Sequence, residues 1–467
     1  MKKTIHGSLL FIILSLVHGL TAAQVATSWN LKGNNGTNPA TQFIGTTDKK
    51  ALHFRADNII AGELDPITGN VFWGLRAGQK NTSGYSNIGI GTDALKLNLS
   101  GLRSTAIGDS ALYSNTSGNY NTANGYQALF SNSSGYCNTS SGSYSLGDNS
   151  NGALNTADGF LALGQNATGS GNTATGAYTL QSNTSGLENT ADGYAALNDN
   201  LTGYFNTSIG ALAMSTNTSG IHNTAVGTYA AYKNDGGYGS YNTAIGSGAL
   251  FATTNSQYNT TLGYNAGYNH DMGYNNTILG ANCDVNAAGL YNCIAIGQGV
   301  ICTASSQARI GNQYTNSIGG YASWTNFSDG RYKKDVKNDV KGIDFIMRLR
   351  PVTYRLDVTA INNKLNEDRS VEIDSSSRIA VTEKESIRFS GFVAQDVETA
   401  ANESGYDFSG VDKPKNPNDF YGLRYSDFVI PLVKAVQELN KKVETLDTII
   451  EDLQKRLKLL EQKKNSQ

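Results

Sequence analysis

The seventeen residues "NTADGYAALNDNLTGYF", Asn189 to Phe205, form one unit of a repeat that fills the middle of this 467-residue chain. The same opening recurs as "NTANG" at Asn121 and as "NTAVG" at Asn223, and a two-residue insertion follows the second of these. Steps of seventeen, with that insertion allowed for, give fourteen copies. The copies begin at Asn70, Asn87, Ser104, Asn121, Asn138, Asn155, Asn172, Asn189, Asn206, Asn223, Asn242, Asn259, Asn276 and Cys293. A strict period this short predicts stacked rungs, each of which packs on its neighbours.

Two further columns share the period and indicate what a rung contains. Glycine recurs from Gly84 to Gly220, usually within "N-x-[ST]-G", and an apolar side chain recurs from Leu95 to Met214. Seventeen residues are enough for two short strands and two turns, and glycine and asparagine tolerate the positive φ of tight turns. The predicted fold is therefore mostly β, a parallel β-solenoid or β-roll rod over residues 70–312. At about 4.8 Å per rung, the rod is expected to be roughly 65 Å long.

The residue after the rung's alanine changes character along the rod. This column contains Ile90, Ile107, Asn124, Ser141, Asp158, Thr175, Asp192, Ile209, Val226, Ile245 and Leu262. It is polar in the middle and apolar towards both ends, so we predict that it faces outward and that its ends pack on another chain or on neighbouring domains. A ladder of threonines from Thr122 to Thr190 is interpreted as part of a structural Asn/Thr ladder, with binding of ice or sugars as the alternative. The "N-x-[ST]" sequons are interpreted as a by-product of the repeat.

The repeat also resembles a known class of fibrous protein. From about Gly69 to Gly311 it is similar to the β-roll heads of trimeric autotransporter adhesins and to the shafts of phage tail fibres, in which short "A-I-G" repeats stack. The resemblance implies left-handed parallel rolls that associate in threes, and therefore a homotrimeric fibre. Its implied partners are copies of itself and a cell-surface glycan or protein receptor.

The N-terminal stretch "MKKTIHGSLLFIILSLVHGLTAAQ" is typical of a secretory signal peptide. Lys2 and Lys3 form its charged region, residues 9–17 form its apolar core, and small residues precede a cleavage point before Gln24. No later apolar run is long enough for a transmembrane helix. We therefore predict a signal peptide over residues 1–23 and an exported bacterial protein, secreted or held at the cell surface. Residues 24–69 are assigned to an N-terminal cap or tip region. A net charge of −2 does not favour a nucleic-acid partner.

The cysteines and histidines do not indicate a metal site, a cofactor or a histidine-based triad. The cysteines are Cys137, Cys283, Cys293 and Cys302, and the histidines after the signal peptide are His53, His222 and His270. Neither set has the spacing of metal ligands. The last three cysteines are interpreted either as buried small apolar side chains or as partners in a disulfide formed after export.

After residue 312 the composition becomes charged and globular. We predict a connector at 313–327, a small α+β domain at 328–425, and a helix at 426–465. Within the domain, residues 339–356 predict a short helix and then a strand, 358–388 an extended loop or hairpin, and 387–403 a strand that enters a helix. The final helix is expected to have Ser426 or Asp427 as N-cap and Pro431 in its first turn.

The final helix carries the heptad pattern of a coiled coil. Its two apolar positions are filled by Val429, Val436, Val443, Ile450 and Leu457, and by Leu432, Leu439, Leu446, Leu453 and Leu460. β-branched residues at one position with leucine at the other favour two strands. A fibre favours three, and we choose the trimer because the rod and the coil then share one symmetry axis.

Three stretches, in this order and followed by the coiled coil, carry a more specific resemblance. These are "SDGRYKKDV" from Ser328, "FSGFVAQDVE" from Phe389 and "YSDFVIPLVKAVQELN" from Tyr425. They are similar to the C-terminal intramolecular chaperone of phage endosialidases and tail fibres, which also occurs in myelin regulatory factor. The family trimerises, templates the folding of the fibre, and cuts itself off as a serine–lysine peptidase. The resemblance implies that Ser328 is the nucleophile and Lys333 the base, with cleavage between Phe327 and Ser328.

The chemistry of such a pair sets conditions that spacing alone does not meet. A serine hydroxyl needs a base, and a lysine serves as one when burial or neighbouring charge lowers its pKa. Residues five apart do not share a face of a strand or a helix, so the backbone must bend, and Gly330 is assigned that role. Lys334 remains an alternative base. In a purely structural interpretation the stretch is a solvated turn capped by Ser328 or Asp329.

Two other functions remain open at this stage. The fibre is an extracellular polysaccharide-degrading or polysaccharide-binding protein if Asp158 and Asp192, two rungs apart, act as paired carboxylates. Alternatively, the C-terminal domain is a permanent trimer clamp in a stalk that is not cleaved.

Overall fold

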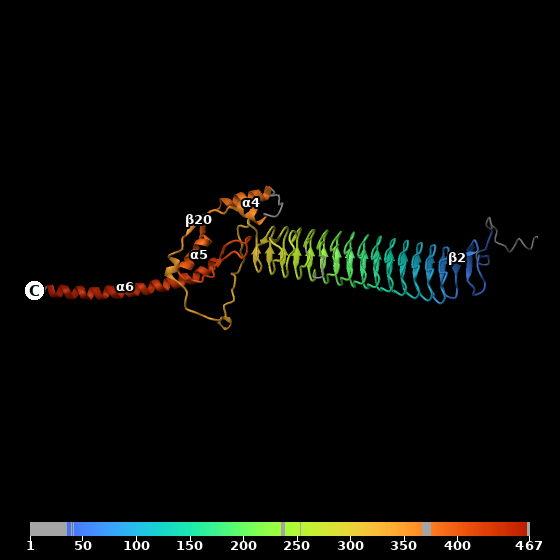
Figure 1. The fold of residues 1–467 in the computed structure, drawn as a ribbon, viewed down its shortest axis with the longest axis horizontal. Coiled ribbons are helices and arrows are strands. Elements are labelled where there is room, and N and C mark those ends of the chain that lie inside the picture. The colour runs from blue at the N-terminus through green and yellow to red at the C-terminus, as the bar shows by residue number, and fades with distance from the viewer. Residues whose placement is uncertain are drawn as a thin grey trace, which may run out of the picture.

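The computed structural model describes residues 35–38, 40, 42–234, 239–252, 254–366 and 375–464. A rod of stacked rungs is followed by a small α+β region, and a long helix leaves that region on the side opposite the rod (Figure 1). The predicted class, a parallel β-solenoid of about fourteen turns before a small α+β region and a C-terminal helix, is confirmed. The predicted signal peptide lies outside the described residues.

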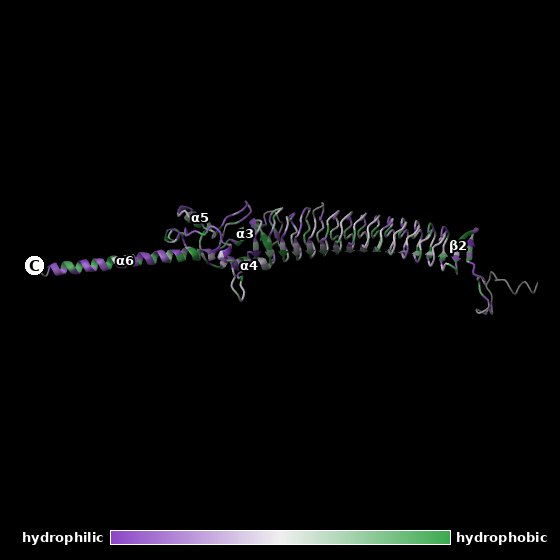
Figure 2. Ribbon diagram, turned by 90° about the horizontal axis from the view of Figure 1, so that it is seen from below, coloured by the Kyte–Doolittle hydropathy of each residue, from purple (hydrophilic) through white to green (hydrophobic). Residues whose placement is uncertain are grey.

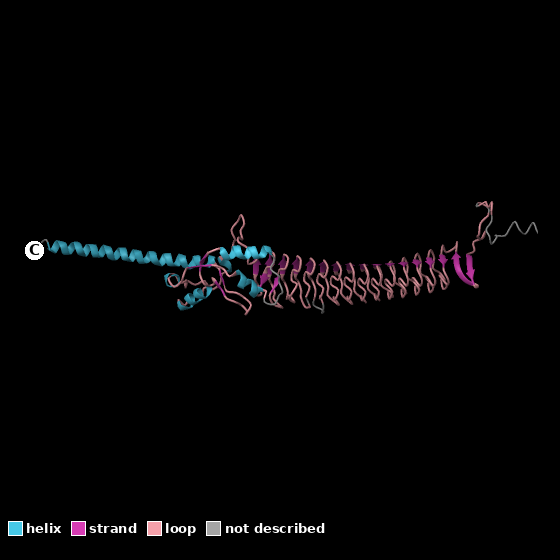
Figure 3. Ribbon diagram, turned by 90° about the horizontal axis from the view of Figure 1, so that it is seen from above, coloured by secondary structure: helices cyan, strands magenta, loops and turns pink. Residues whose placement is uncertain are grey.

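Each rung contributes one three-residue strand to a continuous sheet along one side of the rod (Figure 3). The first is β3 (Val71–Trp73), and neighbouring strands are parallel with a step of seventeen residues, so that Thr156 lies opposite Thr173. The following strands are β4 (Ile88–Ile90), β5 (Thr105–Ile107), β6 (Thr122–Asn124), β7 (Thr139–Ser141), β8 (Thr156–Asp158), β9 (Thr173–Thr175), β10 (Thr190–Asp192), β11 (Thr207–Ile209), β12 (Thr224–Val226), β13 (Thr243–Ile245), β14 (Thr260–Leu262), β15 (Thr277–Leu279), β17 (Ile294–Ile296) and β19 (Ala308–Ile310).

The prediction of two strands per rung is wrong for most of the rod. Within the described part of the chain a second strand occurs only at β16 (Asp284–Val285) and β18 (Ile301–Cys302), which pair with each other. Elsewhere the rest of the rung is a series of turns, and these use positive φ at residues that rarely adopt it. Leu95 has a φ of 52°, and the same conformation recurs in its column. Its side chain is fully buried, so burial offsets a backbone cost of about 1–2 kcal/mol.

Two buried columns of asparagine connect one rung to the next. In the first column, the backbone N–H of Asn172 donates to Oδ1 of Asn155 at 3.0 Å, and Asn155 Nδ2 donates to the carbonyl of Gly169 at 2.9 Å. In the second, Nδ2 of Asn166 donates both to Oδ1 of Asn149 at 2.9 Å and to Gly169 at 3.0 Å. All four asparagines are fully buried. Each amide therefore satisfies polar groups of two rungs in an interior that water does not reach.

The glycine of "N-x-[ST]-G" is required because this ladder passes so close to it. A Cβ on Gly169 would lie 2.5 Å from the carbonyl oxygen of Gly186 and 2.6 Å from Asn183 Nδ2. The asparagine of the sequon is the buried ladder residue itself. The interpretation of the sequons as a by-product of the repeat is consistent with this burial.

The N-terminal end of the rod is covered by an antiparallel hairpin. Strand β1 (Leu52–Ala56) pairs with β2 (Ile59–Leu64), and β2 pairs antiparallel with β3. The edge of the first rung is thereby occupied, as sheet edges in soluble proteins generally are. Phe72 fills the core of this rung, where most later rungs carry alanine, and is 2% exposed. The hairpin lies within residues 24–69, and the assignment of that region as a cap or tip stays a prediction.

The column of residues after the alanine faces outward from the sheet in the single chain, as predicted. The column after the alanine is exposed or half-buried, with Ile90 and Ile107 at one end and Ile245 and Leu262 at the other among its exposed members. The threonines of β6 to β10 are exposed on the same face, in register. The hydrogen-bonded ladder inside the rod is made of asparagine.

All four cysteines are free thiols, and three of them are buried near the end of the rod. The Cys293 thiol lies against the carbonyl of Ala304 at 3.5 Å, and the Cys302 thiol against that of Ile294 at 3.6 Å. A hydrogen bond between these two thiols lowers the pKa of Cys293 and raises the pKa of Cys302. Cys283, Cys293 and Cys302 pack in the rod core as small side chains.

The α+β region has a small apolar core and short elements. Its core residues are Phe345, Val397, Ala400, Ala401, Phe408 and Phe428. Its elements are η1 (Gly330–Tyr332), α2 (Ile343–Ile346), β20 (Val352–Tyr354), α3 (Val358–Leu365), α4 (Ser375–Ser386), β21 (Phe389–Gly391), α5 (Ala394–Glu403), β22 (Val411–Asp412), β23 (Gly422–Leu423), η2 (Tyr425–Phe428) and α6 (Val429–Lys464). The predicted helix and strand within 339–356 are present, as is the strand–helix order of 387–403.

Two local predictions in this region are wrong. Residues 358–388 were expected to be a loop or hairpin, yet they include α3 and α4. Their polar composition suggested a loop, but Asp357 caps α3 by accepting from the Ala360 N–H at 2.7 Å, and Glu385 accepts from the Thr359 N–H at 2.9 Å. Neither Ser426 nor Asp427 is an N-cap, because both lie within η2. Asp427 instead accepts a hydrogen bond from Ser409.

The apolar heptad positions of α6 are exposed to solvent in the single chain. Hydrophobic and hydrophilic residues alternate along the helix (Figure 2). The leucines and β-branched residues of the seam are all exposed, from Val429 to Leu460. Pro431 is the third residue of α6, as predicted for its first turn. Among the described residues, no helix combines the length and the apolar character that a membrane crossing needs.

The asparagine ladder leads to a prediction about rod stability. Asn166→Asp removes both hydrogen bonds that Nδ2 donates and places a carboxylate in a buried site. We expect a loss of about 3 kcal/mol in the free energy of unfolding, because a buried charge without a partner is costly. Denaturant unfolding of the two proteins, followed by circular dichroism, measures the difference.

Asn124→Asp is the matched control, since Asn124 is exposed on the outer face and its column carries aspartate at 158 and 192. It is expected to change stability by less than about 0.5 kcal/mol. Equal effects of the two substitutions would contradict the assignment of the ladder as the contact that holds the rungs together.

Candidate functional site

The segment between the rod and the α+β region protrudes from the rest of the chain. It forms the yellow-to-orange loop at the bottom of Figure 1. Residues 316–328 are all exposed, and the Phe327 side chain is exposed along its whole length. A peptide bond in this segment is therefore accessible, as a bond that is to be cleaved must be.

A single 3₁₀ turn, η1, bends the backbone just after Ser328. Asp329 is its N-cap and accepts a hydrogen bond from the Arg331 N–H at 3.0 Å. The Arg331 guanidinium pairs with the same carboxylate at 2.6 Å. These hydrogen bonds from Arg331 lower the pKa of Asp329. Asp329 and Arg331 thus fix the turn through the cap and the ion pair.

The turn brings the two predicted catalytic residues into contact. Lys333 Nζ donates to Ser328 Oγ at 2.8 Å, and both side chains are exposed. The bend does not use the conformational freedom of Gly330, because this glycine has no positive φ and a Cβ there would meet no atom within 4 Å. The predicted role of Gly330 is therefore wrong, and the capped turn supplies the bend. The lysine that hydrogen-bonds to Ser328 is Lys333, and not Lys334, which was the alternative candidate for the base.

This arrangement has part of what serine–lysine chemistry requires. The hydroxyl of Ser328 and the amine of Lys333 are at the distance of a proton transfer. The carbonyl that would be attacked belongs to Phe327, the preceding residue, so the reacting groups are held within one short segment. A lysine acts as a base in its neutral form, and burial favours that form. In one chain the pair is exposed to solvent.

Two residues of the "FVAQD" stretch, Phe392 and Asp396, make contacts that support the fold. Phe392 stacks on Phe428 with ring centroids 5.3 Å apart, and its N–H donates to the Tyr425 hydroxyl at 3.1 Å. Asp396 forms an ion pair with Arg350.

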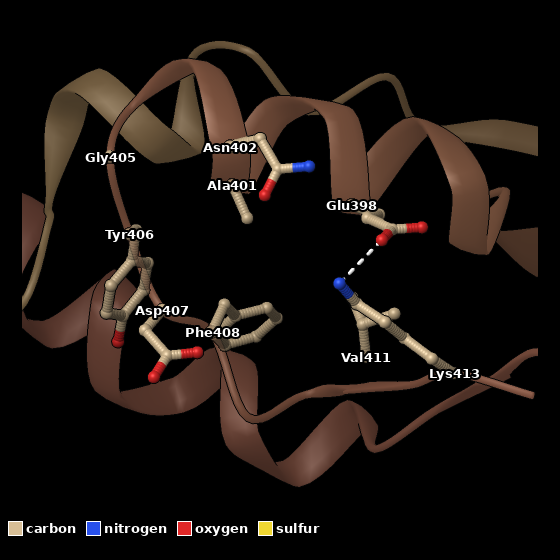
Figure 4. A pocket seen from close by; sticks show the side chains of 9 residues that line it. All are labelled: Glu398, Ala401, Asn402, Gly405, Tyr406, Asp407, Phe408, Val411 and Lys413. Atoms are coloured by element: carbon tan, nitrogen blue, oxygen red, sulfur yellow. Dashed lines mark ion pairs between the residues drawn. The ribbon is translucent and has the colours of Figure 1, made fainter. Parts of the chain in front are cut away.

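A pocket of about 320 Å³ lies between α5 and the loop that leads into β22 (Figure 4). The Lys413 ammonium and the Glu398 carboxylate face each other across it at 2.6 Å. Hydrogen bonds from Lys413 and from Tyr421 lower the pKa of Glu398. Its lining residues include neither Ser328 nor Lys333. The Glu398 and Lys413 charges therefore pair with each other within this pocket.

The carboxylates considered for glycoside chemistry lie elsewhere, on the rod. Asp158 ends β8 and Asp192 ends β10, with Thr175 of β9 between them in register. Both are exposed on the outer face of the sheet. Glycosidases hold their carboxylates in a cleft around the sugar, and an exposed sheet face does not provide one.

Comparison with known proteins gives one match. Neither the curated proteins nor the solved structures contain a match to this chain. A family model described as Chaperone of endosialidase matches residues 328–406, and it therefore begins at Ser328 itself. This chain carries a C-terminal domain of the endosialidase chaperone family behind a β-solenoid rod.

Proposed function

We propose that the protein is an exported fibre whose C-terminal chaperone domain assembles three chains, helps the rod to fold, and then cleaves the chain before Ser328. The observation that carries this proposal is the 2.8 Å contact between Lys333 Nζ and Ser328 Oγ. It is supported by the family match that starts at the same serine. The fibre itself serves in adhesion or surface display.

Association of three chains is supported by two apolar surfaces that one chain leaves open. The seam of α6 exposes ten apolar side chains at heptad spacing, between Val429 and Leu460. The outer face of the rod sheet exposes apolar residues at both ends, such as Ile90 and Leu262. Exposed apolar surface of this extent is typical of protein interfaces. A three-fold axis along the molecule covers both surfaces with the same contact in each chain.

The cleavage proceeds by attack of the serine on its own peptide bond. Neutral Lys333 takes the proton of Ser328 Oγ, and the oxygen attacks the carbonyl carbon of Phe327. The C–N bond then breaks, and the Ser328 amine leaves with the proton, so that Phe327 is held as an ester on Oγ. Water hydrolyses this ester. The products are a rod that ends in the Phe327 carboxylate and a fragment of 140 residues, Ser328 to Gln467.

Cleavage is expected to depend on assembly. Ser328, Lys333 and Phe327 are exposed in one chain, whereas a lysine base and an oxyanion both need a site from which water is excluded. A neighbouring chain that covers the protruding segment supplies this environment. Premature cleavage of an unassembled chain is thereby avoided.

The first test is cleavage of the full chain and of point variants. Wild type is expected to give a new N-terminus at Ser328, and Ser328→Ala and Lys333→Met are each expected to slow its appearance at least about a thousandfold. Denaturing gels with intact mass measurement follow both fragments. Ser323→Ala and Lys334→Met, in the same exposed region, are controls that cleave normally. A wild-type chain that stays full-length would refute self-cleavage and would favour the alternative, a stalk that is not cleaved.

The second test concerns the turn between the two residues. Gly330→Ala is expected to cleave within about threefold of wild type, because the added Cβ meets no neighbour. Asp329→Ala removes the cap and the partner of Arg331, and is expected to slow cleavage roughly fivefold. The rates are compared by quantifying the fragment over time. A larger effect at Gly330 than at Asp329 argues against the capped turn as the positioning device.

The third test concerns assembly. Leu446→Lys places a charge in the exposed seam of α6, and is expected to convert a trimer into monomers and to suppress cleavage. Thr448→Lys, two residues further on and outside both apolar heptad positions, is the matched control and remains trimeric. Light scattering coupled to gel filtration gives the mass of each. A wild-type monomer refutes the trimer.

A further inference from the structure

The last rung of the rod is closed by a loop of the chaperone domain. This loop, residues 413–421, connects β22 to β23 and reaches back to the turn between β18 and β19. Its central residue is Asp419, whose side chain is 3% exposed. We refer to this loop as the clamp loop. It is far from the rod in sequence, and its contacts with the rod are polar and specific.

Three rod side chains converge on the carboxylate of Asp419. Gln307 Nε2 donates to Oδ1 at 3.0 Å, Thr303 donates its hydroxyl proton, and the Arg309 guanidinium lies at 3.5 Å. Arg309 also donates to the Thr303 hydroxyl at 2.6 Å, so the three side chains form one network. Burial alone would raise the pKa of Asp419, but the hydrogen bonds from Thr303, from Gln307 and from the loop backbone hold it below its usual value.

The clamp loop also contacts the rod through its asparagines. Asn416 Nδ2 donates to the backbone carbonyl of Thr303 at 2.7 Å. Asn286 of the rod donates to the carbonyl of Asn418 at 3.3 Å. Next to these contacts, a cavity of about 340 Å³ is lined by apolar residues of both parts, including Ile301, Ile361 and Phe420. The contact therefore combines a buried charge, amide hydrogen bonds and apolar packing.

These contacts replace those that a further rung would make. Gln307 directly precedes the last strand, β19, in the place that the ladder asparagine takes before earlier strands. In those rungs the asparagine Nδ2 donates to a carbonyl in the turn that leads into the next strand, as Asn155 does to Gly169 before β9. In the last rung the side-chain amide of Gln307 donates to Asp419 instead. The clamp loop thus satisfies the polar groups of an edge that would otherwise remain open.

We propose that the clamp loop is a non-covalent lock on the end of the rod, and that it holds the chaperone fragment in place after the chain has been cut. The site on the rod, Thr303, Gln307 and Arg309, recognises a carboxylate presented on a short loop. The lock is independent of the peptide link. Only its role after self-processing rests on the proposed function.

The position of the cleavage site supports this independence. Every rod residue of the lock precedes the bond between Phe327 and Ser328, and every residue of the clamp loop follows it. The cut bond itself lies in the exposed, protruding segment, so cutting it removes none of the contacts described. Release of the fragment requires that the partly exposed ion pair between Asp419 and Arg309 and the hydrogen bonds around Asp419 be broken together.

The experiment separates the lock from self-cleavage. In the full chain with Ser328→Ala, a recognition sequence for a site-specific protease is inserted in the exposed segment at 316–326, and the purified protein is cut in trans. We expect the rod and the C-terminal fragment to co-elute on gel filtration near about 0.15 M salt, and to separate on a denaturing gel. With Asp419→Asn added, the dissociation constant is expected to rise about tenfold or more. The fragment then elutes separately at the same concentration.

Asp407→Asn, an exposed aspartate of the same domain, is the matched control and keeps the fragments together. The lock is refuted if the fragment of the Asp419-intact protein elutes alone, or if Asp419→Asn co-elutes as strongly as Asp407→Asn. Circular dichroism of each uncut variant verifies that the domain is folded. If wild type is never cut but the protease-cut chain co-elutes, self-cleavage is refuted while the lock stands.

Discussion

The buried asparagine amide is the interaction on which this molecule depends. A rung of this rod contains one short strand and a thin core of alanine and leucine, which bury little apolar area and cannot stand alone. The amides give each rung a fixed set of partners on both sides, and the partners are satisfied only when neighbouring rungs are in register. Register, and not core volume, therefore defines the native rod. The same requirement explains why both ends need a cover, which is a hairpin at one end and a loop from the chaperone domain at the other.

At the candidate site, local structure sets the contact between the two side chains, whereas the long-range packing of the chain leaves them exposed. A capped turn is enough to place a lysine amine against a serine hydroxyl, since Asp329 and Arg331 form it within one short stretch. A turn of this size buries nothing. The chemistry needs an interior, and the single chain keeps that interior away from the protruding segment. The contact between Lys333 and Ser328 is thus encoded locally.

Much of the fold could be predicted from the sequence because it is periodic. The rung length, the ladder asparagines and the helix seam each repeat often enough for their spacing to be unambiguous, and they correspond to the strands and to α6. The turns could not be predicted in the same way. Leucine at positive φ contradicts local propensity, and stacking of rungs decides it. The helices α3 and α4 were missed because their polar sequences resemble loops, and their end contacts come from side chains such as Asp357 and Glu385.

The candidate site shows the same limit. The pair Ser328 and Lys333 was identified by resemblance to a family. The reason for their contact is the cap at Asp329, whereas the sequence allowed either Ser328 or Asp329 as the cap. The network at Asp419 was not predicted at all. Asp419 follows Gln307 by 112 positions and Thr303 by 116 positions in the sequence, and the two stretches share no motif. Gln307 takes the place of a ladder asparagine before β19 and donates to Asp419, and this substitution can be recognised only once the ladder is known.

The strict step between rungs has a consequence for how such a fibre changes over generations. Each internal rung meets only copies of itself, and the insertion between Asn223 and Asn242 leaves the pairing of β12 with β13 in register. An in-frame duplication or loss of one seventeen-residue unit therefore creates no new kind of contact, and both end covers still find the surfaces they fit. The reach of the fibre is inherited as a whole number of units, so lineages can lengthen or shorten it by unequal recombination without redesigning the protein.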